Sequence, residues 1–278
     1  MSNVELKPIV KWVGGKRQSL SELEKYIPDD YNNYIEPFIG GGALFFKLQP
    51  KKAIINDING ELINLYNIIK SDVSELILDL NKHKNNKEYF YEIREIDRSI
   101  DDFNKLSNIE KASRMLYLNK TCFNGMYRVN KKNEFNVPYG NYKNPKIIDE
   151  LNLYNLNKYL NKNDIKIFNK DFEDILMMAK KEDFVYLDPP YYPISDTSNF
   201  TDYSKDGFNK EDQIRLKENC DKLNKKNINF LQSNSYCDFI LDLYSDYNII
   251  EIYSKRVINS QGDKRGEVKE VLITNMEV

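Results

Sequence analysis

The sequence predicts an α/β fold in which a mostly parallel sheet carries an inserted block of helices. Three observations indicate this fold. Short apolar runs alternate with helical patterns towards both ends of the 278-residue chain, which is typical of a parallel sheet with helices on its faces. The middle of the chain keeps a helical apolar period without strand patterns. The last two strand-like runs lie close together, so we expect an antiparallel pair and hence one antiparallel strand.

Seven short runs rich in β-branched and aromatic residues predict the strands. They are residues 34–37, 53–56, 165–168, 184–187, 229–232, 249–253 and 270–274. Helical patterns such as residues 213–224 lie between them, and residues 61 to about 118 keep one apolar face. Residues 127–139 then predict a hairpin with its turn at 130–133. We expect residues 1–60 and 163–278 to form the sheet domain and residues 61–162 to form a second, inserted domain.

The first predicted strand runs into Gly40, Gly41 and Gly42, ahead of a helical segment. Glycines between a strand and a helix let the backbone approach a nucleoside closely. Asp57 ends the next strand, near the ~20-residue spacing at which a carboxylate meets ribose hydroxyls. The pattern is neither a GxGxxG nor a P-loop, which favours a nucleoside without the phosphates that those loops hold. S-adenosylmethionine is such a ligand, and a flexible strand–helix turn is the structural alternative.

Asp188-Pro189-Pro190-Tyr191 follows the apolar strand at 184–187. Two prolines cannot donate to a ladder and therefore end the strand. A carboxylate, backbone carbonyls and an aromatic ring then gather at the carboxyl end of a strand, where open α/β sheets bind ligands. This set suits a flat ring that carries an amino group. The alternative is a proline-rich turn with Asp as a turn former.

Residues 119–146 combine cations with aromatic rings. Six Lys and Arg residues face a single Glu, which gives this stretch a net charge of +5. Such a mixture suits phosphates and bases, although a solvated surface loop is the alternative. The whole chain carries a net charge of −2 and gives no indication of nucleic acid. The N-terminal segment contains the only tryptophan, Trp12, and Lys16, which we expect to meet a ligand carboxylate.

Composition excludes several classes of protein. His83 is the only histidine, which argues against His-based triads and most zinc sites. The three cysteines show no metal-binding spacing, which fits a reducing cytoplasm. No apolar stretch approaches the ~20 residues of a membrane span, and the first residues lack the apolar core of a signal peptide. We therefore expect a cytoplasmic protein without a membrane anchor or a metal.

Taken together, the motifs resemble those of the Dam-type (D12 class) adenine-N6 DNA methyltransferases, especially the GATC-specific methylases of restriction–modification systems. The resemblance covers nearly all of residues 8–275. Its motifs occur in the family's order: Lys11-Trp12-x-Gly14-Gly15-Lys16, Glu36-Pro37-Phe38-x-Gly40-Gly41-Gly42, Asn56-Asp57-x-Asn59, Asn124-Gly125-x-x-Arg128, Phe135-Asn136-Val137-Pro138-Tyr139-Gly140, Asp171-Phe172 and Asp188–Tyr191. The resemblance implies a Rossmann-like S-adenosylmethionine-dependent methyltransferase sheet with an inserted helical and β-hairpin DNA-recognition domain.

The resemblance also implies a role for individual residues. The target-adenine site comprises Asp188, Pro189, Pro190 and Tyr191. The cofactor site comprises Trp12, Lys16, Glu36, Pro37, Phe38, Gly40, Gly41, Gly42, Asp57, Asp171, Phe172 and Asp188. The DNA contacts are Lys11, Phe123, Asn124, Met126, Arg128, Lys131 and Pro138, with Arg128 reading a guanine, Phe123 acting as a wedge and Lys131 meeting a phosphate. No metal is implied. Lys170 and Met126 depart mildly from the family pattern, since glycine and leucine are common there.

The function implied is methyl transfer to N6 of a flipped-out adenine in GATC, by a monomer acting on double-stranded DNA, with a separately encoded restriction endonuclease as a partner. Four alternatives stay open. A cytosine-N4 or RNA methyltransferase shares the chemistry, although Ser in place of Asp188 is the mark of cytosine N4. A non-catalytic DNA-binding protein leaves the cofactor motifs unexplained. A nicotinamide oxidoreductase explains the glycines and Asp57, but not Asp188–Tyr191.

Overall fold

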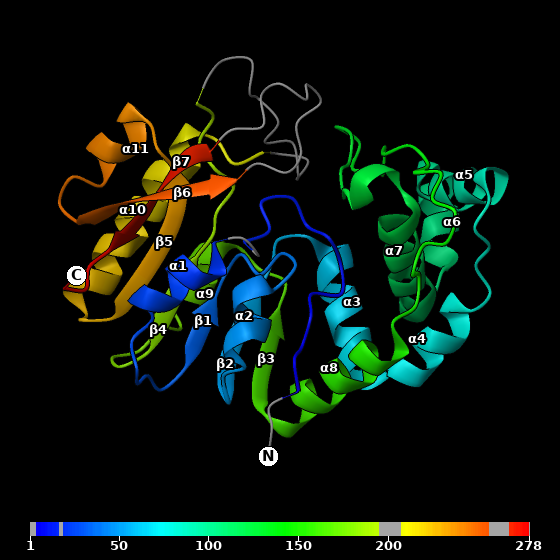
Figure 1. The fold of residues 1–278 in the computed structure, drawn as a ribbon, viewed down its shortest axis with the longest axis horizontal. Coiled ribbons are helices and arrows are strands. Elements are labelled where there is room, and N and C mark those ends of the chain that lie inside the picture. Colours follow the sequence, from blue (N-terminus) through cyan, green and yellow to red (C-terminus); the bar gives the residue numbers. More distant parts are fainter. Residues whose placement is uncertain (1–3, 17–18, 195–206, 256–266, 278) are drawn as a thin grey trace.

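The computed structural model describes residues 4–16, 19–194, 207–255 and 267–277, and within them a seven-stranded sheet lies beside a block of helices (Figure 1). The strand order is β3-β2-β1-β4-β5-β7-β6. The strands are β1 (Tyr34–Glu36), β2 (Lys52–Asn56), β3 (Asp164–Phe168), β4 (Phe184–Leu187), β5 (Asn229–Ser235), β6 (Asn248–Lys255) and β7 (Glu267–Thr274).

The sheet is mostly parallel, as the sequence predicts. Strands β3, β2, β1, β4 and β5 pair in parallel, while β7 lies antiparallel between β5 and β6. All seven predicted strands are present. β5 runs on to Ser235, beyond the predicted end at 232, because its polar residues Ser233 and Asn234 pair with β7 and are fully buried. A polar run of this kind carries no apolar signal in the sequence.

Helices cover both faces of the sheet. On one face lie α1 (Leu20–Leu23), α2 (Ala43–Leu48) and α3 (Gly60–Ser71), and on the other lie α9 (Phe172–Leu176), α10 (Lys210–Lys225) and α11 (Asp238–Leu243). Neighbouring residues of β4 alternate between the two cores, with Tyr186 on the first face and Val185 on the second. A central parallel strand is buried on both faces, which accounts for its continuous apolar run.

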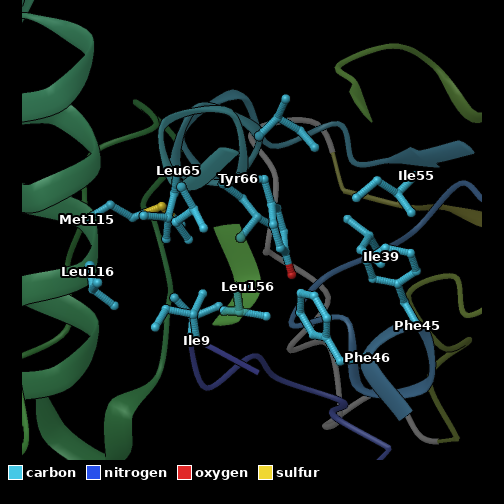
Figure 2. Packing of buried hydrophobic residues seen from close by; sticks show 14 of the residues in the cluster. Ile9, Ile39, Phe45, Phe46, Ile55, Leu65, Tyr66, Met115, Leu116 and Leu156 are labelled. Atoms are coloured by element: carbon cyan, nitrogen blue, oxygen red, sulfur yellow. The ribbon is translucent and has the colours of Figure 1, made fainter. Parts of the chain in front are cut away.

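The predicted helical middle is also present. It continues from α3 through α4 (Val73–Leu80), α5 (Lys87–Glu95), α6 (Ile100–Lys105), α7 (Asn108–Thr121) and α8 (Glu150–Lys162), with single 3₁₀ turns at Ile96–Arg98 and Phe123–Gly125. A further 3₁₀ turn, Glu24–Tyr26, follows α1. Its core is continuous with one face of the sheet, since Phe46 of α2, Tyr66 of α3 and Met115 of α7 belong to one buried cluster (Figure 2). The division at residues 61–162 stays a prediction. No described helix combines the length and the apolar content needed to span a membrane.

The segment between α7 and α8 folds back on itself, as the predicted hairpin does. Cys122 bridges Tyr139, and Val129 bridges Phe135, both in antiparallel fashion. The backbone of Asn133 has a φ of 64°, a left-handed conformation that suits the predicted turn. Along this segment buried and half-buried residues alternate. Tyr127, Val129, Phe135 and Val137 face the core, while Arg128, Asn136 and Pro138 lie towards the outside.

Candidate active site

Four carboxylates lie at one edge of the sheet, where the parallel strands end. Glu36 ends β1, Asp57 follows β2, Asp171 lies beyond β3 and Asp188 follows β4. The chain order reverses between β1 and β4, since β2 lies on the far side of β1 and β5 on the far side of β4. Ligands bind at such a switch point, outside the carboxyl ends of the strands. The structure thus brings the predicted site residues to one edge.

The glycine run forms a tight turn held against β2. Both Gly40 and Gly42 have positive φ, 47° and 70°, which disfavours any side chain. A Cβ on Gly40 would lie 2.7 Å from Cδ1 of Trp12. Asp57 anchors the turn, since Oδ2 accepts the Gly40 N–H at 3.0 Å and Oδ1 accepts the Asn59 N–H at 2.9 Å. Burial raises the Asp57 pKa to about 6, although these two N–H groups lower it.

Glu36 is a buried carboxyl group beside this turn. It accepts a hydrogen bond from the Tyr34 hydroxyl at 2.7 Å. Burial raises the Glu36 pKa well above its usual value, and the nearby negative charges of Asp188 and Asp57 raise it further. A cationic ligand would relieve this repulsion and favour the ionised forms. Glu36 and Asp57 therefore fit the charge of a sulfonium nucleoside.

Asn56 connects the ends of three strands, a role that the sequence did not predict. Its Nδ2 donates to the Pro37 carbonyl at 2.9 Å and to the Lys170 carbonyl at 3.0 Å, while its Oδ1 accepts the Lys170 N–H at 2.8 Å. The side chain is 1% exposed. A lone amide at the end of an apolar strand is the sequence signal that could have indicated such a hydrogen-bonded role.

Lys16, Asp188 and Tyr191 form a compact cluster after β4. The Lys16 Nζ lies 2.8 Å from Asp188 Oδ1 and 4.3 Å from the centre of the Tyr191 ring. Each carboxylate oxygen has two lone pairs, so Oδ1 can accept a further N–H beside this ion pair. The Tyr191 hydroxyl donates to Glu270 Oε2 at 3.0 Å. The Lys16 contact with a ligand carboxylate stays a prediction, and the sequence gave no role to Glu270.

The charges of this cluster depend on one another. Burial raises the Asp188 pKa, and the Lys16 cation opposes that rise. Burial lowers the Lys16 pKa, but Asp188, Tyr186 and Glu270 together outweigh this effect, and the pKa of Lys16 is raised. Each group therefore stabilises the ionised form of the other in a site shielded from water.

Buried amides hold the backbone of the Asp188–Tyr191 motif. Gln213 of α10 donates from Nε2 to the Pro190 carbonyl at 2.9 Å, and Asn234 of β5 donates to Gln213 Oε1 at 3.0 Å. Asn234 Oδ1 accepts the Tyr192 N–H at 3.3 Å. Gln213 and Asn234 are fully buried. The polar extension of β5 that the sequence missed thus positions the motif.

Asp171 and Phe172 lie at the end of β3 beside the β1 loop. The Phe172 ring lies 5.4 Å from that of Phe38. Arg215 of α10 binds both oxygens of Asp171, at 2.7 and 3.0 Å, and its guanidinium lies 4.2 Å from the Phe172 ring centre. Burial alone would raise the Asp171 pKa, but Arg215 and a backbone N–H outweigh it and the pKa is lowered. Arg215 is a further residue that the sequence did not predict.

Trp12 and Lys11 link the sheet edge to the helical block. The N-terminal segment runs between the two parts of the molecule (Figure 1). Trp12 stacks on Tyr127 with ring centres 4.9 Å apart and also contacts Gly40. The backbone of Lys11 makes two hydrogen bonds with the Asn119 side chain of α7, at 3.0 and 2.9 Å. The Lys11 side chain is exposed beside Gly125.

The predicted DNA contacts gather on the outer face of the 122–140 segment. Phe123 is 53% exposed, so its ring is accessible to a ligand. Asn124 has a φ of 58°. The Arg128 Nε donates to Asn136 Oδ1 at 2.7 Å. Lys131 lies exposed in the turn, and Pro138 is exposed. Met126 is only partly exposed and packs on the core.

Two observations concern the rest of the described residues. A groove of about 450 Å³ lies over the sheet, lined by Asn33, Ile54, Phe168 and Met177 among others, and it contains none of the predicted site residues. Within the described ranges, no group of three or more His, Cys, Asp or Glu side chains is placed to hold a metal ion.

The chain is similar to known proteins over nearly its whole length. Residues 12–258 match the family model of the D12 class N6 adenine-specific DNA methyltransferases. The chain is 46% identical to the type II methyltransferase M1.LlaDCHI of Lactococcus lactis subsp. cremoris, over 99% of this chain and 97% of that protein. It is 45% identical to the type II methyltransferase M.MjaIII of Methanocaldococcus jannaschii, over 98% and 100%. It is 32% identical to the DNA adenine methylase of Escherichia coli (strain K12), over 96% and 94%.

Proposed function

Since the chain belongs to the D12 class N6 adenine-specific DNA methyltransferases, we propose that it transfers a methyl group from S-adenosylmethionine to N6 of a flipped-out adenine in GATC. The family makes DNA the substrate and requires a methyl donor. The observation that carries the proposal is the Lys16–Asp188–Tyr191 cluster, which lies at the sheet edge beside the carboxyl groups of Glu36 and Asp57.

The chemistry required of the chain is modest. S-adenosylmethionine supplies an activated methyl group as a sulfonium. The adenine N6 is a poor nucleophile because its lone pair is delocalised into the ring. The Asp188 carboxylate and the Pro189 carbonyl accept its two N–H groups, which favours a pyramidal nitrogen with an available lone pair. The N6–methyl bond would form as the methyl–sulfur bond of the sulfonium breaks and leaves a neutral thioether. The proton lost from N6 would pass to the Asp188 carboxylate and on to solvent. Positioning and electrostatics then account for most of the rate.

The surrounding residues prepare this site. Lys16 keeps Asp188 ionised, and the Gln213–Asn234 pair fixes the backbone on either side of Tyr191. The Lys16 cation lies over the Tyr191 ring, and the target base stacks on Tyr191. Because an adenine cannot react inside the duplex, it must leave the stack. The exposed ring of Phe123 then fills the space that the flipped adenine leaves in the duplex, as a wedge.

The cofactor residues predict a pH-dependent affinity. We expect Asp57→Ala to weaken S-adenosylmethionine binding by about 1–3 kcal/mol, the loss typical of charge-assisted hydrogen bonds.

Since the Asp57 pKa lies at about 6 and the Glu36 pKa is also raised, the wild-type affinity should fall as the pH drops through 6, with protons released on binding. Calorimetry in two buffers measures both the affinity for S-adenosylmethionine and the number of protons released on binding. Asp57→Asn removes the charge of the side chain but keeps its shape, and exposed Asp30→Ala is the control. Unchanged affinity for S-adenosylmethionine in both Asp57 variants would exclude a contact between Asp57 and the ribose.

The outer face of the 122–140 segment predicts sequence specificity. We expect Arg128→Ala to relax selection at one outer base pair of GATC, since a bidentate Arg–guanine pair contributes ~1–3 kcal/mol of discrimination. Lys131→Ala should instead weaken DNA binding on all sequences and reduce its salt dependence, as a phosphate contact does. Methylation rates on duplexes carrying each single-base variant of GATC measure both effects. If Arg128→Ala slows all sites equally, Arg128 is a backbone contact.

The same set of duplexes tests the function as a whole. Fastest methylation of adenine in GATC is the expected result, and a different preferred site would contradict the proposed specificity while leaving the chemistry in place. Methylated cytosine would favour the cytosine-N4 alternative. The monomeric state, the separately encoded restriction endonuclease and the cytoplasmic location stay predictions.

A further inference from the structure

We propose that Asn136 is a positioning residue that fixes the Arg128 guanidinium for reading a guanine. The inference rests on the proposed role of Arg128 and deepens it. The Val129–Phe135 bridge sets a register in which Arg128 lies directly opposite Asn136. The Asn136 N–H donates to the Arg128 carbonyl at 3.1 Å. Side chains that lie opposite each other on one face of an antiparallel pair interact directly.

The side-chain contact between the two residues has a defined chemistry. The Arg128 Nε donates to Asn136 Oδ1 at 2.7 Å. Because a guanidinium donates only, the amide oxygen of Asn136 must face it, and the orientation of the amide follows. Among the described residues this is the one hydrogen bond of the Arg128 side chain, and none of their carboxylates pairs with it. The two terminal nitrogens therefore stay available as a fork.

The backbone next to Asn136 is itself held in place by side chains. Asp97 Oδ2 accepts the Phe135 N–H at 2.8 Å, and Arg98 Nη2 donates to the Phe135 carbonyl at 2.7 Å. Asp97 in turn pairs with Arg114 at 2.7 Å, and both side chains are less than a tenth exposed. A buried ionic group thus fixes the backbone next to Asn136, and Asn136 fixes the side chain of Arg128.

This arrangement separates two tasks within one arginine. A long flexible side chain loses rotamer freedom when it orders on a ligand, and ordering it beforehand lowers that cost. Asn136 binds the Nε edge, so the terminal edge is presented outwards in one orientation. A bidentate contact with guanine O6 and N7 depends on such orientation, whereas attraction to a phosphate does not.

The test compares kcat/KM on GATC with kcat/KM on each single-base variant. Asn136→Ala should lower discrimination about 3- to 10-fold at the base pair that Arg128 reads, and leave the other positions and the salt dependence of binding unchanged. Asn136→Asp keeps the acceptor and should retain the discrimination. In a protein that already carries Arg128→Ala, Asn136→Ala should cause no further loss of discrimination. Exposed Asn144→Ala is the control.

The outcomes distinguish this inference from the function on which it rests. If Arg128→Ala relaxes one base pair while Asn136→Ala leaves discrimination intact, the inference is overturned and the role of Arg128 stands. If Asn136→Ala alters a different base pair, or acts equally with and without Arg128, Asn136 contacts DNA itself and the inference is overturned. If Arg128→Ala leaves discrimination intact, the guanine-reading role fails and the inference fails with it.

Discussion

Asp188→Ala should lower the single-turnover rate of methyl transfer by roughly 10³-fold, with cofactor affinity largely retained. Removing a preorganised partner of the reacting group typically costs ~10²–10³ in rate. Asp188 follows β4, and its carboxylate keeps acceptor positions for the target amine beside the Lys16 ion pair. An acceptor used mainly in the transition state affects the chemical step rather than binding.

Two variants make the Asp188 result interpretable. Asp188→Asn keeps the shape but replaces one oxygen by a donor, and it should be nearly as slow. Asp246→Ala removes a largely exposed carboxylate, 81% accessible, and should leave the rate unchanged. Rapid-quench single turnovers together with calorimetry of the cofactor give the two quantities. Retention of most of the rate in Asp188→Ala would remove Asp188 from the catalytic site.

Lys16→Met should slow methyl transfer about 10- to 100-fold at pH 7 and move the acid limb of the pH–rate profile upwards by about one to three pH units. Burial already raises the Asp188 pKa, and the Lys16 cation is the group that opposes this rise. Without the cation the carboxyl pKa rises further. Since the ionised form accepts the amine, activity is lost as the pH falls through that pKa, and raising the pH restores it.

The pH profile separates this role from a cofactor contact. Recovery of Lys16→Met towards the wild-type rate near pH 9 is expected if Lys16 acts through Asp188. A raised Kd for S-adenosylmethionine with an unchanged pH profile would instead support the contact with a ligand carboxylate that the sequence predicts. Exposed Lys226→Met, just after α10, serves as the control for the loss of one cation.

The sequence predicted most of the sheet because its strands are apolar and short. Even the antiparallel position of β7 followed from two neighbouring strand patterns. The polar end of β5 was missed, since Ser233 and Asn234 are buried through hydrogen bonds that no local pattern reveals. The hairpin was predicted as a unit, but the structure pairs it through two isolated bridges.

At the site, the sequence identified groups but not their partners. Asp57, Asp171 and Asp188 reach the sheet edge as their strand ends predict. The partners of Asp171 and Asp188, Arg215 and Lys16, come from segments far apart in the chain, and only the folded chain brings such residues together. Lys16 shows the difference most clearly, because in the structure it pairs with a carboxylate of the protein itself.

Long-read sequencing of DNA from cells that express this protein, in a host without adenine methylation of its own, tests the central claim most directly. We predict N6-methyladenine at GATC on both strands with the wild-type protein, and none with Asp188→Ala at equal expression. Methylated cytosine, N6-methyladenine in another motif, or methylation that persists in Asp188→Ala would contradict the account.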